Sequence, residues 1–255
     1  ASREEVAQHT HLLPAVHKIG EGGYDGRGVR ILKTIQDLEN GFEGPSVLEK
    51  MVEINKEIAI IVAVSQSGTI TLYPPVDMVF DPMLNLLSHQ LCPAALTQQV
   101  LWKAEAIALS AVKNLESPGL FAVEMFTDKN DNVFINEIAP RVHNSGHHTI
   151  EGNYCSQFDM LWRIILNYPP GNTGIIMASA LVNIVGDEGF EGDAIYVGME
   201  EVLSMENAFV HIYGKEQTKP GRKMGHVTVT GNDKQDLLYK VRKIKNSLFV
   251  RSHKN

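Results

Sequence analysis

The segment Phe121-Ala-Val-Glu-Met-Phe-Thr-Asp-Lys-Asn-Asp-Asn-Val-Phe-Ile-Asn-Glu-Ile138 decides how this chain folds around its most informative residues. Two runs rich in β-branched and aromatic residues, 121–127 and 133–138, flank a polar stretch of Asp and Asn. This pattern predicts a β-hairpin with a loop of about four or five residues. If the loop is 129–132, antiparallel pairing places Glu124 directly opposite Glu137.

Glu124 and Glu137 would then share one side of the sheet, where two like charges repel each other. A cation held between them would remove that repulsion. Two carboxylates on neighbouring strands, completed by water and phosphate oxygens, are what Mg²⁺ requires in a nucleotide site. The hairpin therefore predicts a magnesium site. The alternative is an exposed hairpin whose two glutamates point into solvent.

The residues that follow the hairpin are polar and crowd together directly after a strand. They are Arg141, His143, Asn144, Ser145, His147 and His148. Arginine, histidine and asparagine side chains are seldom found together in a core and readily donate hydrogen bonds to anions. The run therefore predicts an anion-binding loop beside the carboxylate pair.

The composition of the 255 residues is typical of a soluble globular protein, with 44% hydrophobic and 21% charged residues. The net charge of −7 and the absence of a Lys/Arg run argue against a nucleic-acid surface, because nothing would neutralise a phosphate backbone. The sequence contains no apolar run long enough to span a membrane. Cys92 and Cys155 form neither a pair motif nor a metal cluster, so buried free thiols are expected. These features predict a cytoplasmic protein.

A glycine-rich run lies near the amino terminus. Residues 13–19 are expected to form a short strand carrying Lys18, and it leads into residues 20–28, where five of nine positions are glycine. Glycine reaches positive φ values, which lets successive backbone N–H groups turn toward a bound anion. The run predicts a phosphate-binding loop, and the alternative is a mobile hairpin tip.

The rest of the chain mixes strands and helices, which predicts an α+β fold. Strands are expected at 47–52, 57–64 and 69–73, with the first of them starting a second sheet, and helices at 97–115 and 156–167. Residues 76–93 have poor periodicity and are expected to form a connection. Short strands at 175–184, 194–196, 209–213 and 225–230 precede a final helix at 234–248, and we place a domain boundary near residue 172.

One connection between two of these late strands, residues 213–226, concentrates positive charge in an otherwise acidic protein. It contains Lys215, Lys219, Arg222 and Lys223, and it ends at His226. Such a cluster fits a carboxylate- or phosphate-facing role. The alternative is a solvated basic loop.

Three of these motifs together resemble one family. Residues 22–28, 136–147 and 220–226 resemble, in the right order, the N5-carboxyaminoimidazole ribonucleotide synthases, the ATPase subunits of phosphoribosylaminoimidazole carboxylase within the ATP-grasp superfamily. The resemblance covers nearly the whole chain. Members of this family normally begin with a further Rossmann-like domain, whose counterpart is not among these 255 residues.

The resemblance implies the ATP-grasp fold, in which two α+β subdomains clasp ATP, followed by a small β-rich C-terminal domain. The ATP-grasp domain is expected at 1–172, with a glycine-loop lid subdomain at 1–45 and a metal-binding sheet subdomain at 46–172. The C-terminal domain is expected at 173–255.

The resemblance also implies a role for each candidate residue. ATP would be bound by Lys18, Gly22, Gly23, Gly26, Gly28, Glu49, Lys50, Met51, Val52 and Glu57. Of these, Lys18 and the glycines would meet the phosphates, 49–52 the adenine and Glu57 the ribose. Mg²⁺ would be bound by Glu124 and Glu137, and bicarbonate or carboxyphosphate by Arg141, His143 and Asn144. Aminoimidazole ribonucleotide would be faced by Tyr24, Asp25, Lys215 and Arg222.

The activity that the resemblance implies is a C–N bond-forming ligase reaction of purine biosynthesis. Transfer of the ATP γ-phosphoryl group to bicarbonate would give carboxyphosphate. The exocyclic amine of aminoimidazole ribonucleotide would then attack carboxyphosphate, or the CO₂ it releases. Either Asp25 or His143 could handle the proton. The resemblance further implies a homodimer.

Two other functions are compatible with part of the sequence. Another ATP-grasp ligase, such as a formate-using glycinamide ribonucleotide transformylase or a biotin carboxylase, would share the glutamate pair and the glycine loop. It would not be expected to carry the His-Asn-Ser-Gly-His run at 143–147. A non-catalytic nucleotide-binding module would instead bind MgATP without substrate-dependent hydrolysis.

Overall fold

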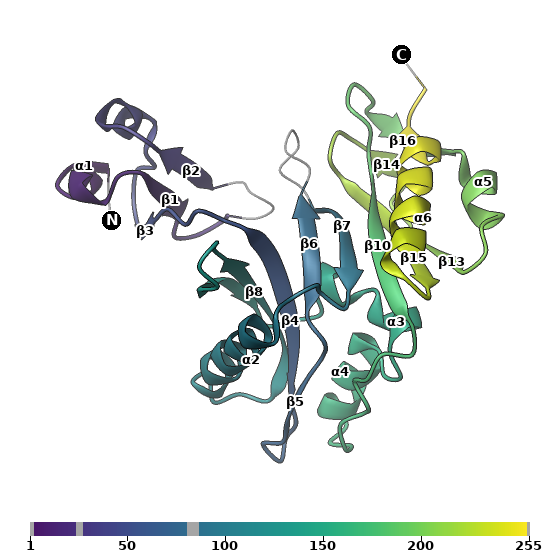
Figure 1. The fold of residues 1–255 in the computed structure, drawn as a ribbon. Helices are drawn as coiled ribbons and strands as arrows, with labels where there is room; N and C mark the ends of the chain where they lie inside the picture. The colour runs from purple at the N-terminus through teal and green to yellow at the C-terminus, as the bar shows by residue number, and fades with distance from the viewer. Residues whose placement is uncertain (1–2, 24–27, 81–86, 254–255) are drawn as a thin grey trace. The chain divides into compact units, whose positions relative to one another are not determined.

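The computed structural model describes residues 3–23, 28–80 and 87–253. The chain forms two compact units (Figure 1). The first comprises Ala1–Glu53 with Pro82–Leu86, and the second comprises Ile54–Asp81 with Leu87–Asn255. Three predicted site residues, Tyr24, Asp25 and Gly26, lie outside the described residues.

The first unit is built on a three-stranded antiparallel sheet with β1 (Ala15–Ile19) at its centre, between β2 (Val29–Leu32) and β3 (Ser46–Lys50). Around it lie α1 (Arg3–Ala7) and two 3₁₀ helices, η1 (Thr10–Leu12) and η2 (Ile35–Asn40). The strand at 46–50 therefore completes this small sheet. Our expectation that it begins the second sheet is wrong, because the partner of a short strand depends on long-range pairing that its own sequence does not specify.

The second unit contains a nine-stranded sheet in the order β13-β15-β10-β7-β6-β4-β8-β9, with β5 paired to β4. Every pairing in it is antiparallel. Its strands are β4 (Lys56–Val64), β5 (Ile70–Leu72), β6 (Val76–Phe80), β7 (Leu87–Cys92), β8 (Gly119–Thr127), β9 (Val133–Ala139), β10 (Ala178–Val185), β13 (Ala208–Ile212) and β15 (Lys223–Gly231).

Strands β6 and β7 correct the expectation that residues 76–93 form a connection. Val76, Asp77 and Met78 are all buried, so this strand shows no alternation of polar and apolar residues. The buried Asp77 is satisfied by Lys56, whose Nζ lies 3.0 Å from Oδ1, and by the backbone N–H of Ala95. A strand covered on both faces lacks the period of two by which a strand is recognised.

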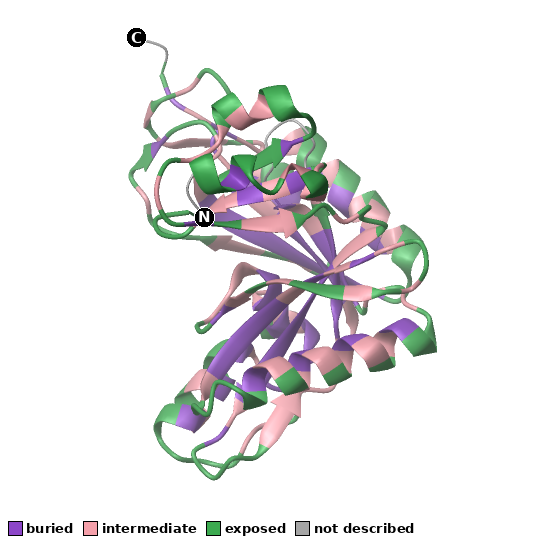
Figure 2. Ribbon diagram, turned by 90° about the vertical axis from the view of Figure 1, so that its left-hand side faces the viewer, coloured by how far each residue is buried: buried purple, intermediate pink, exposed green. Residues whose placement is uncertain are grey.

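Two helices cover opposite faces of β4 and β8. Alternate residues of these strands, including Ile60 and Val123, pack under α2 (Gln98–Lys113), which begins after its cap Thr97. The intervening residues, including Ile61 and Ala122, pack under α4 (Gln157–Ile165), which Ser156 caps. Figure 2 shows these central strands as buried.

The carboxyl-terminal part of the second unit contributes β10, β13 and β15 to the same sheet and covers them with α6 (Lys234–Ser247). The predicted domain boundary near residue 172 stays a prediction; β10, which follows it, pairs with β7, which precedes it. The remaining elements are η3 (Asn144–Gly146), α3 (Thr149–Gly152), β11 (Gly192–Asp193), β12 (Ile195–Val197), α5 (Met199–Leu203), β14 (Gln217–Thr218) and β16 (Phe249–Arg251).

One further expectation is confirmed. Cys92 and Cys155 are buried free thiols. Among the residues that the structure describes, no helix combines the length and the apolar character needed to cross a membrane.

A carboxylate pair and its supporting loop as the candidate active site

The β8–β9 hairpin places Glu124 opposite Glu137, as the sequence predicts. The register of the two strands next to the turn, however, differs from the predicted register. Pairing next to the turn joins Thr127 to Val133, which leaves a loop of 128–132 and would set Glu124 opposite Asn136. A β-bulge between Glu124 and Met125 shifts the register by one residue and restores the pairing of the two glutamates.

Because side chains alternate along a strand, Glu124 and Glu137 point to the side opposite α2. Glu57 of β4 points to this same side, two residues along β4 from Ala59, the partner of Glu124. Burial raises the pKa of Glu57 to about 7. A carboxyl group with that pKa can donate or accept a hydrogen bond near neutral pH.

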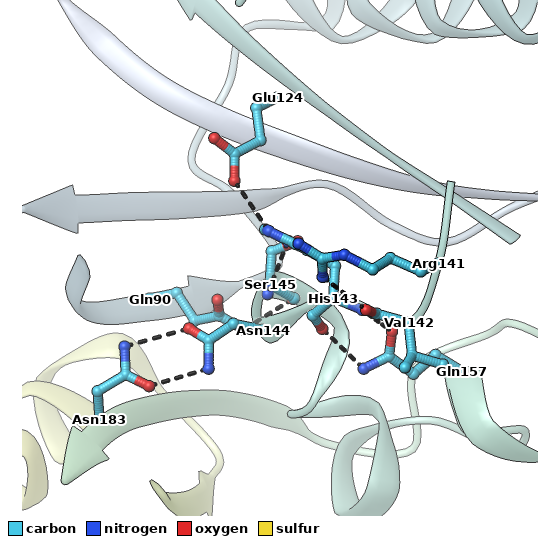
Figure 3. Close-up of polar contacts among 9 residues, drawn as sticks. All are labelled: Gln90, Glu124, Arg141, Val142, His143, Asn144, Ser145, Gln157 and Asn183. Carbon is cyan, nitrogen blue, oxygen red and sulfur yellow. Dashed lines mark hydrogen bonds and ion pairs between the residues drawn. The ribbon is translucent and has the colours of Figure 1, made fainter. Parts of the chain in front are cut away.

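His143 joins the two glutamates to form the candidate site. One ligand atom from each of Glu124, Glu137 and His143 lies within 4.8 Å of the other two, and His143 Nε2 is 3.6 Å from Glu124 Oε1. The side chains of Glu124 and His143 are only 13% and 14% exposed, which limits solvent screening of their charges. Figure 3 shows His143 reaching toward Glu124 from the loop after β9.

The hydrogen bonds of the His143 ring indicate which nitrogen carries the proton. The backbone N–H of Ser145 donates to Nδ1, so the His143 side chain caps η3 and Nδ1 is an acceptor. In the neutral ring the proton is then on Nε2, and it points toward the Glu124 carboxylate. His143 is therefore placed as a hydrogen-bond donor and is not available as a metal ligand through Nε2.

The donor set fits a hard divalent cation. Mg²⁺ prefers oxygen ligands and usually takes one or two carboxylates with water and phosphate oxygens. Glu124 and Glu137 supply such oxygens from two adjacent strands of one sheet. With His143 acting as a donor, the described residues do not offer the closed set of nitrogen and sulfur ligands that zinc selects.

The loop after β9 is held by Gln157, the first residue of α4, which is fully buried. Its Oε1 accepts from the backbone N–H of His143 over 2.9 Å, and its Nε2 donates to the carbonyl of His143 over 2.8 Å. Nε2 also lies 2.7 Å from Nδ1 of His147. A Cβ on Gly146 would come within 2.6 Å of Gln157 Oε1, so only glycine leaves room for this clamp.

Part of the polar run serves the core, which we did not expect. Ser145 and His148 are both 1% exposed. The carbonyl of Ser145 accepts from the buried Gln90 on β7, whose Nε2 also lies 3.0 Å from Nδ1 of His148. Burial lowers the pKa of both His147 and His148 to about 4, so both are neutral at pH 7. The members of the run that stay at least partly exposed are Arg141, His143, Asn144 and His147.

Arg141 and Asn144 differ in how firmly they are held. Arg141 is exposed, and its Nη1 donates to the backbone carbonyl of Val142. Asn144 is bonded through both atoms of its amide to Asn183 on β10.

The predicted ATP-binding residues of the first unit lie on and around its sheet. Lys18 of β1 forms an ion pair with Glu49 of β3, with 2.8 Å between Nζ and Oε2. Gly22 and Gly28 have φ values of +76° and +90°, which favour glycine. Lys50 ends β3, and Gly23, Met51 and Val52 lie outside regular elements.

The predicted substrate-binding cations lie in the β13–β15 connection. Lys215 donates to the carbonyl of Lys223, and Arg222 donates to that of Gln217 over 2.9 Å. Two aromatic residues at the ends of this connection, Tyr213 and His226, contact the loop after β9. Tyr213 lies 2.9 Å from Nδ1 of His226, and the rings of Tyr213 and His226 both contact His147.

Sequence reasoning missed the three amide side chains that support the loop: Gln90, Gln157 and Asn183. Gln157 directly follows the predicted helix cap Ser156, so it could have been noticed as a polar residue at the start of a buried face. Gln90 and Asn183 lie in strands and carry no comparable local signal.

Two family models match the chain. The ATP-grasp domain model matches residues 2–158. The model of the phosphoribosylaminoimidazole carboxylase C-terminal domain matches residues 179–240.

Several of the similar proteins are N5-carboxyaminoimidazole ribonucleotide synthases or synthetases. N5-carboxyaminoimidazole ribonucleotide synthase of Aquifex aeolicus is 35% identical over 249 residues, which covers 95% of this chain and 65% of that protein. The crystal structure of the corresponding synthetase from Thermotoga maritima matches with a TM-score of 0.87 and 40% identity, over 98% of this chain and 66% of that one.

A third similar protein was crystallised with ligands. The synthase of Aspergillus clavatus, in complex with ADP and 5-aminoimidazole ribonucleotide, matches with a TM-score of 0.84 and 31% identity, over 96% of this chain and 65% of that one. The chain thus spans about two thirds of the length of these proteins.

Proposed function

The chain belongs to the ATP-grasp family, and from that premise we propose that it carboxylates 5-aminoimidazole ribonucleotide to N5-carboxyaminoimidazole ribonucleotide with ATP and bicarbonate. It would act as a carboxylate–amine ligase that forms a C–N bond and releases ADP and phosphate. The relatives that bear this name support the assignment, as does the match to the phosphoribosylaminoimidazole carboxylase C-terminal domain.

The observation that carries the proposal is the juxtaposition of the glutamate pair with His143. Two carboxylates and an imidazole N–H donor meet within 4.8 Å of one another, directly before a loop that offers Arg141 and Asn144. Phosphoryl transfer to a small anion requires acidic groups that hold a cation and, beside them, hydrogen-bond donors that hold the anion.

Mg²⁺ held by Glu124 and Glu137 would supply neutralisation of the phosphate charge. The residues of the loop then have the task of positioning bicarbonate. Arg141 would pair with its negative charge, and the Nε2–H of His143 would donate to one of its oxygens. Asn144 would orient it through its amide. Bicarbonate is a poor electrophile, so it must be held in line with the γ-phosphoryl group that converts it into carboxyphosphate.

ATP would be bound by Lys18, Gly22, Gly23, Gly26 and Gly28 at its phosphates, by 49–52 at its adenine and by Glu57 at its ribose. Support for the last role comes from the raised pKa of Glu57, which suits a carboxyl group that hydrogen bonds hydroxyls. Backbone N–H groups of a glycine-rich loop are suited to phosphate oxygens. A closing loop would also exclude water, which would otherwise hydrolyse carboxyphosphate.

The ribonucleotide would be bound by Tyr24, Asp25, Lys215 and Arg222, two of which are cations suited to its phosphate. The proton lost by the exocyclic amine would pass to Asp25 or His143. Of these two, the structure describes only His143, whose ring lies beside the two glutamates. Because its Nε2 already carries a proton, His143 would have to accept at Nδ1, in place of the hydrogen bond from Ser145.

The test is phosphate release from MgATP in bicarbonate buffer, with and without 5-aminoimidazole ribonucleotide. The expected result is release that needs both bicarbonate and the ribonucleotide. Release that is stimulated by formate with glycinamide ribonucleotide, or by biotin, would instead identify another ATP-grasp ligase. MgATP binding with no stimulated release would support a non-catalytic nucleotide-binding module.

We further propose that the protein is a cytoplasmic homodimer. Support comes from three exposed apolar side chains on and after α4, Trp162, Ile165 and Leu166, which are 53–62% exposed. Light scattering during size-exclusion chromatography tests this, and a mass of one chain would contradict it.

A further inference from the structure

Asn183 lies on β10, outside the hairpin and loop that carry the candidate site residues, yet its side chain is paired with that of Asn144. Asn144 Nδ2 donates to Asn183 Oδ1 over 2.9 Å, and Asn183 Nδ2 donates to Asn144 Oδ1 over 3.1 Å. The two carboxamides thus form a reciprocal pair, which Figure 3 shows edge to edge. Each amide restricts the orientation of the other.

A third hydrogen bond fixes the direction of the pair. Asn183 Nδ2 also donates to the backbone carbonyl of Leu87 over 2.7 Å. A carbonyl can only accept, so the NH₂ end of Asn183 must face Leu87. Once Asn183 is oriented, only one orientation of Asn144 sets donor against acceptor at both contacts. The backbone of β7 therefore sets the orientation of the Asn144 amide through Asn183.

The other side of Asn144 is also constrained. Its amide lies close enough to Tyr213 to lower the pKa of that hydroxyl, against the larger rise that burial causes. The Tyr213 hydroxyl in turn lies 2.9 Å from His226 Nδ1, and His226 is 2% exposed. Asn183 on β10 thus bonds the Asn144 amide directly, and Tyr213, the residue after β13, is bonded in turn to His226 on β15.

This arrangement differs from an ordinary hydrogen bond between strands. Asn144 belongs to the loop that carries His143, and its partner Asn183 lies 39 residues further along the chain. Asn183 bonds only the side chain of Asn144, whose backbone carbonyl accepts from the N–H of His147. What Asn183 determines is which edge of the Asn144 amide faces the candidate site.

We propose that Asn183 is a positioning residue for the reaction, which fixes the orientation of Asn144 and thereby the geometry with which that amide meets bicarbonate. This inference rests on the proposed function, in which Asn144 binds bicarbonate. Asn183 itself does not touch the substrate.

The test compares Asn183→Ala, Asn144→Ala and the double variant by kcat/KM for bicarbonate and by KM for ATP. Asn183→Ala should lower kcat/KM for bicarbonate by about 10-fold, because a misplaced contact costs between one and two orders of magnitude. KM for ATP should not change. The double variant should be no slower than Asn144→Ala, since both substitutions remove the same oriented amide.

Asn183→Asp tests whether the hydrogen-bond donors of the Asn183 side chain matter, apart from its size and shape. The carboxylate has the same outline but cannot donate to Leu87 or to Asn144, so the loss should match that of Asn183→Ala. Asn153→Ala is the matched control: Asn153 is 3% exposed and also donates to a backbone carbonyl, that of Thr173. This control should lower the melting temperature and leave kcat/KM for bicarbonate unchanged.

Two kinetic results with single variants would overturn the proposal. One is a wild-type kcat/KM for bicarbonate in Asn183→Ala, and the other is a loss in Asn153→Ala equal to that in Asn183→Ala. Strictly additive losses in the double variant would also contradict it.

A wild-type chain that shows no bicarbonate-dependent release would refute the proposed function alone. In that case the side-chain amide resonances of Asn144 in a ¹⁵N–¹H spectrum test whether Asn183 orients the Asn144 amide. A shift and faster hydrogen exchange of these resonances in Asn183→Ala, without change in Asn153→Ala, would support the positioning role. Unchanged resonances would overturn it.

Discussion

The hairpin that carries the glutamate pair and the hairpin that carries Lys18 are both antiparallel, but they are supported differently. Strand β8 is buried along most of its length, and the loop after β9 is held by the amides of Gln90, Gln157 and Asn183. Strand β2 is exposed at three of its four residues. The Lys18–Glu49 ion pair is 24% and 40% exposed, so solvent screens it.

This difference indicates two ways of building a binding site. The residues that we propose to hold a cation and a small anion lie on buried elements and a loop that those elements support. The residues that we propose to meet the nucleotide phosphates lie on and after β1, beside the largely exposed strand β2. Substitutions in the two regions should therefore affect different quantities.

The largest expected effect comes from the carboxylate pair. Glu137→Gln should reduce phosphate release by about 1,000-fold or more, because it removes a charge that neutralises the cation. Mn²⁺ affinity, measured by electron paramagnetic resonance, should fall in parallel, and the urea midpoint should stay near the wild-type value. The control is Glu188→Gln at an exposed position. Full activity in Glu137→Gln would disprove the metal site.

The next largest effect is on unfolding free energy, where a glycine substitution limited by packing is compared with one limited by backbone strain. Gly146→Ala should cost about 2 to 3 kcal/mol of unfolding free energy, because the new Cβ displaces the buried Gln157 amide from three hydrogen bonds. Gly22→Ala should cost only about 1 kcal/mol, since its φ of +76° is unfavourable but nothing lies within 4 Å of the added atom. Urea unfolding measures both, and equal costs would remove the contrast between the regions.

Acid should weaken the second unit through its buried histidines. Burial lowers the pKa of His147 and His148 to about 4 and that of His226 to about 3, below the ordinary value of 6.5. As pH falls below 6.5, the unfolded chain binds protons that the folded chain cannot bind, so stability falls with pH. The expected loss between pH 6.5 and 5 is about 1 to 2 kcal/mol for each histidine.

Urea unfolding at pH 7.5, 6.5 and 5.0 measures this loss. The first unit contains His17, whose pKa is lowered for the same reason, so hydrogen exchange followed by mass spectrometry is needed to separate the two units. A constant unfolding free energy across this range would show that the three histidines are accessible to protons in the folded state.

The smallest expected effect concerns Lys18. Lys18→Met should weaken ATP binding by about 10-fold, because it removes one charged hydrogen bond to phosphate. Its effect on unfolding free energy should stay below about 1 kcal/mol, since the ion pair with Glu49 is exposed. Titration calorimetry with ATP measures the affinity, and Lys33→Met, at an exposed position beyond β2, is the control. Unchanged ATP affinity in Lys18→Met would exclude this lysine from the nucleotide site.

Much of the local structure could be predicted from the sequence by itself. The hairpin at 121–138, the helix caps Thr97 and Ser156 and the pairing of Glu124 with Glu137 all follow from contiguous patterns. Even here the bulge was not visible, because inserting one residue into a strand leaves its composition unchanged. The chemistry of the site was readable because the two glutamates lie on strands joined by a short loop.

Only the tertiary structure decided the rest. Strands β6 and β7 lack alternation because the fold buries both of their faces, and β3 pairs with β1 in the small sheet. The amide that orients Asn144 comes from a strand 39 residues away. Its choice as a partner depends on sheet order, which brings β10 beside β7. Local patterns encode short-range pairing and capping, whereas contacts between distant segments arise from the packing of the whole unit.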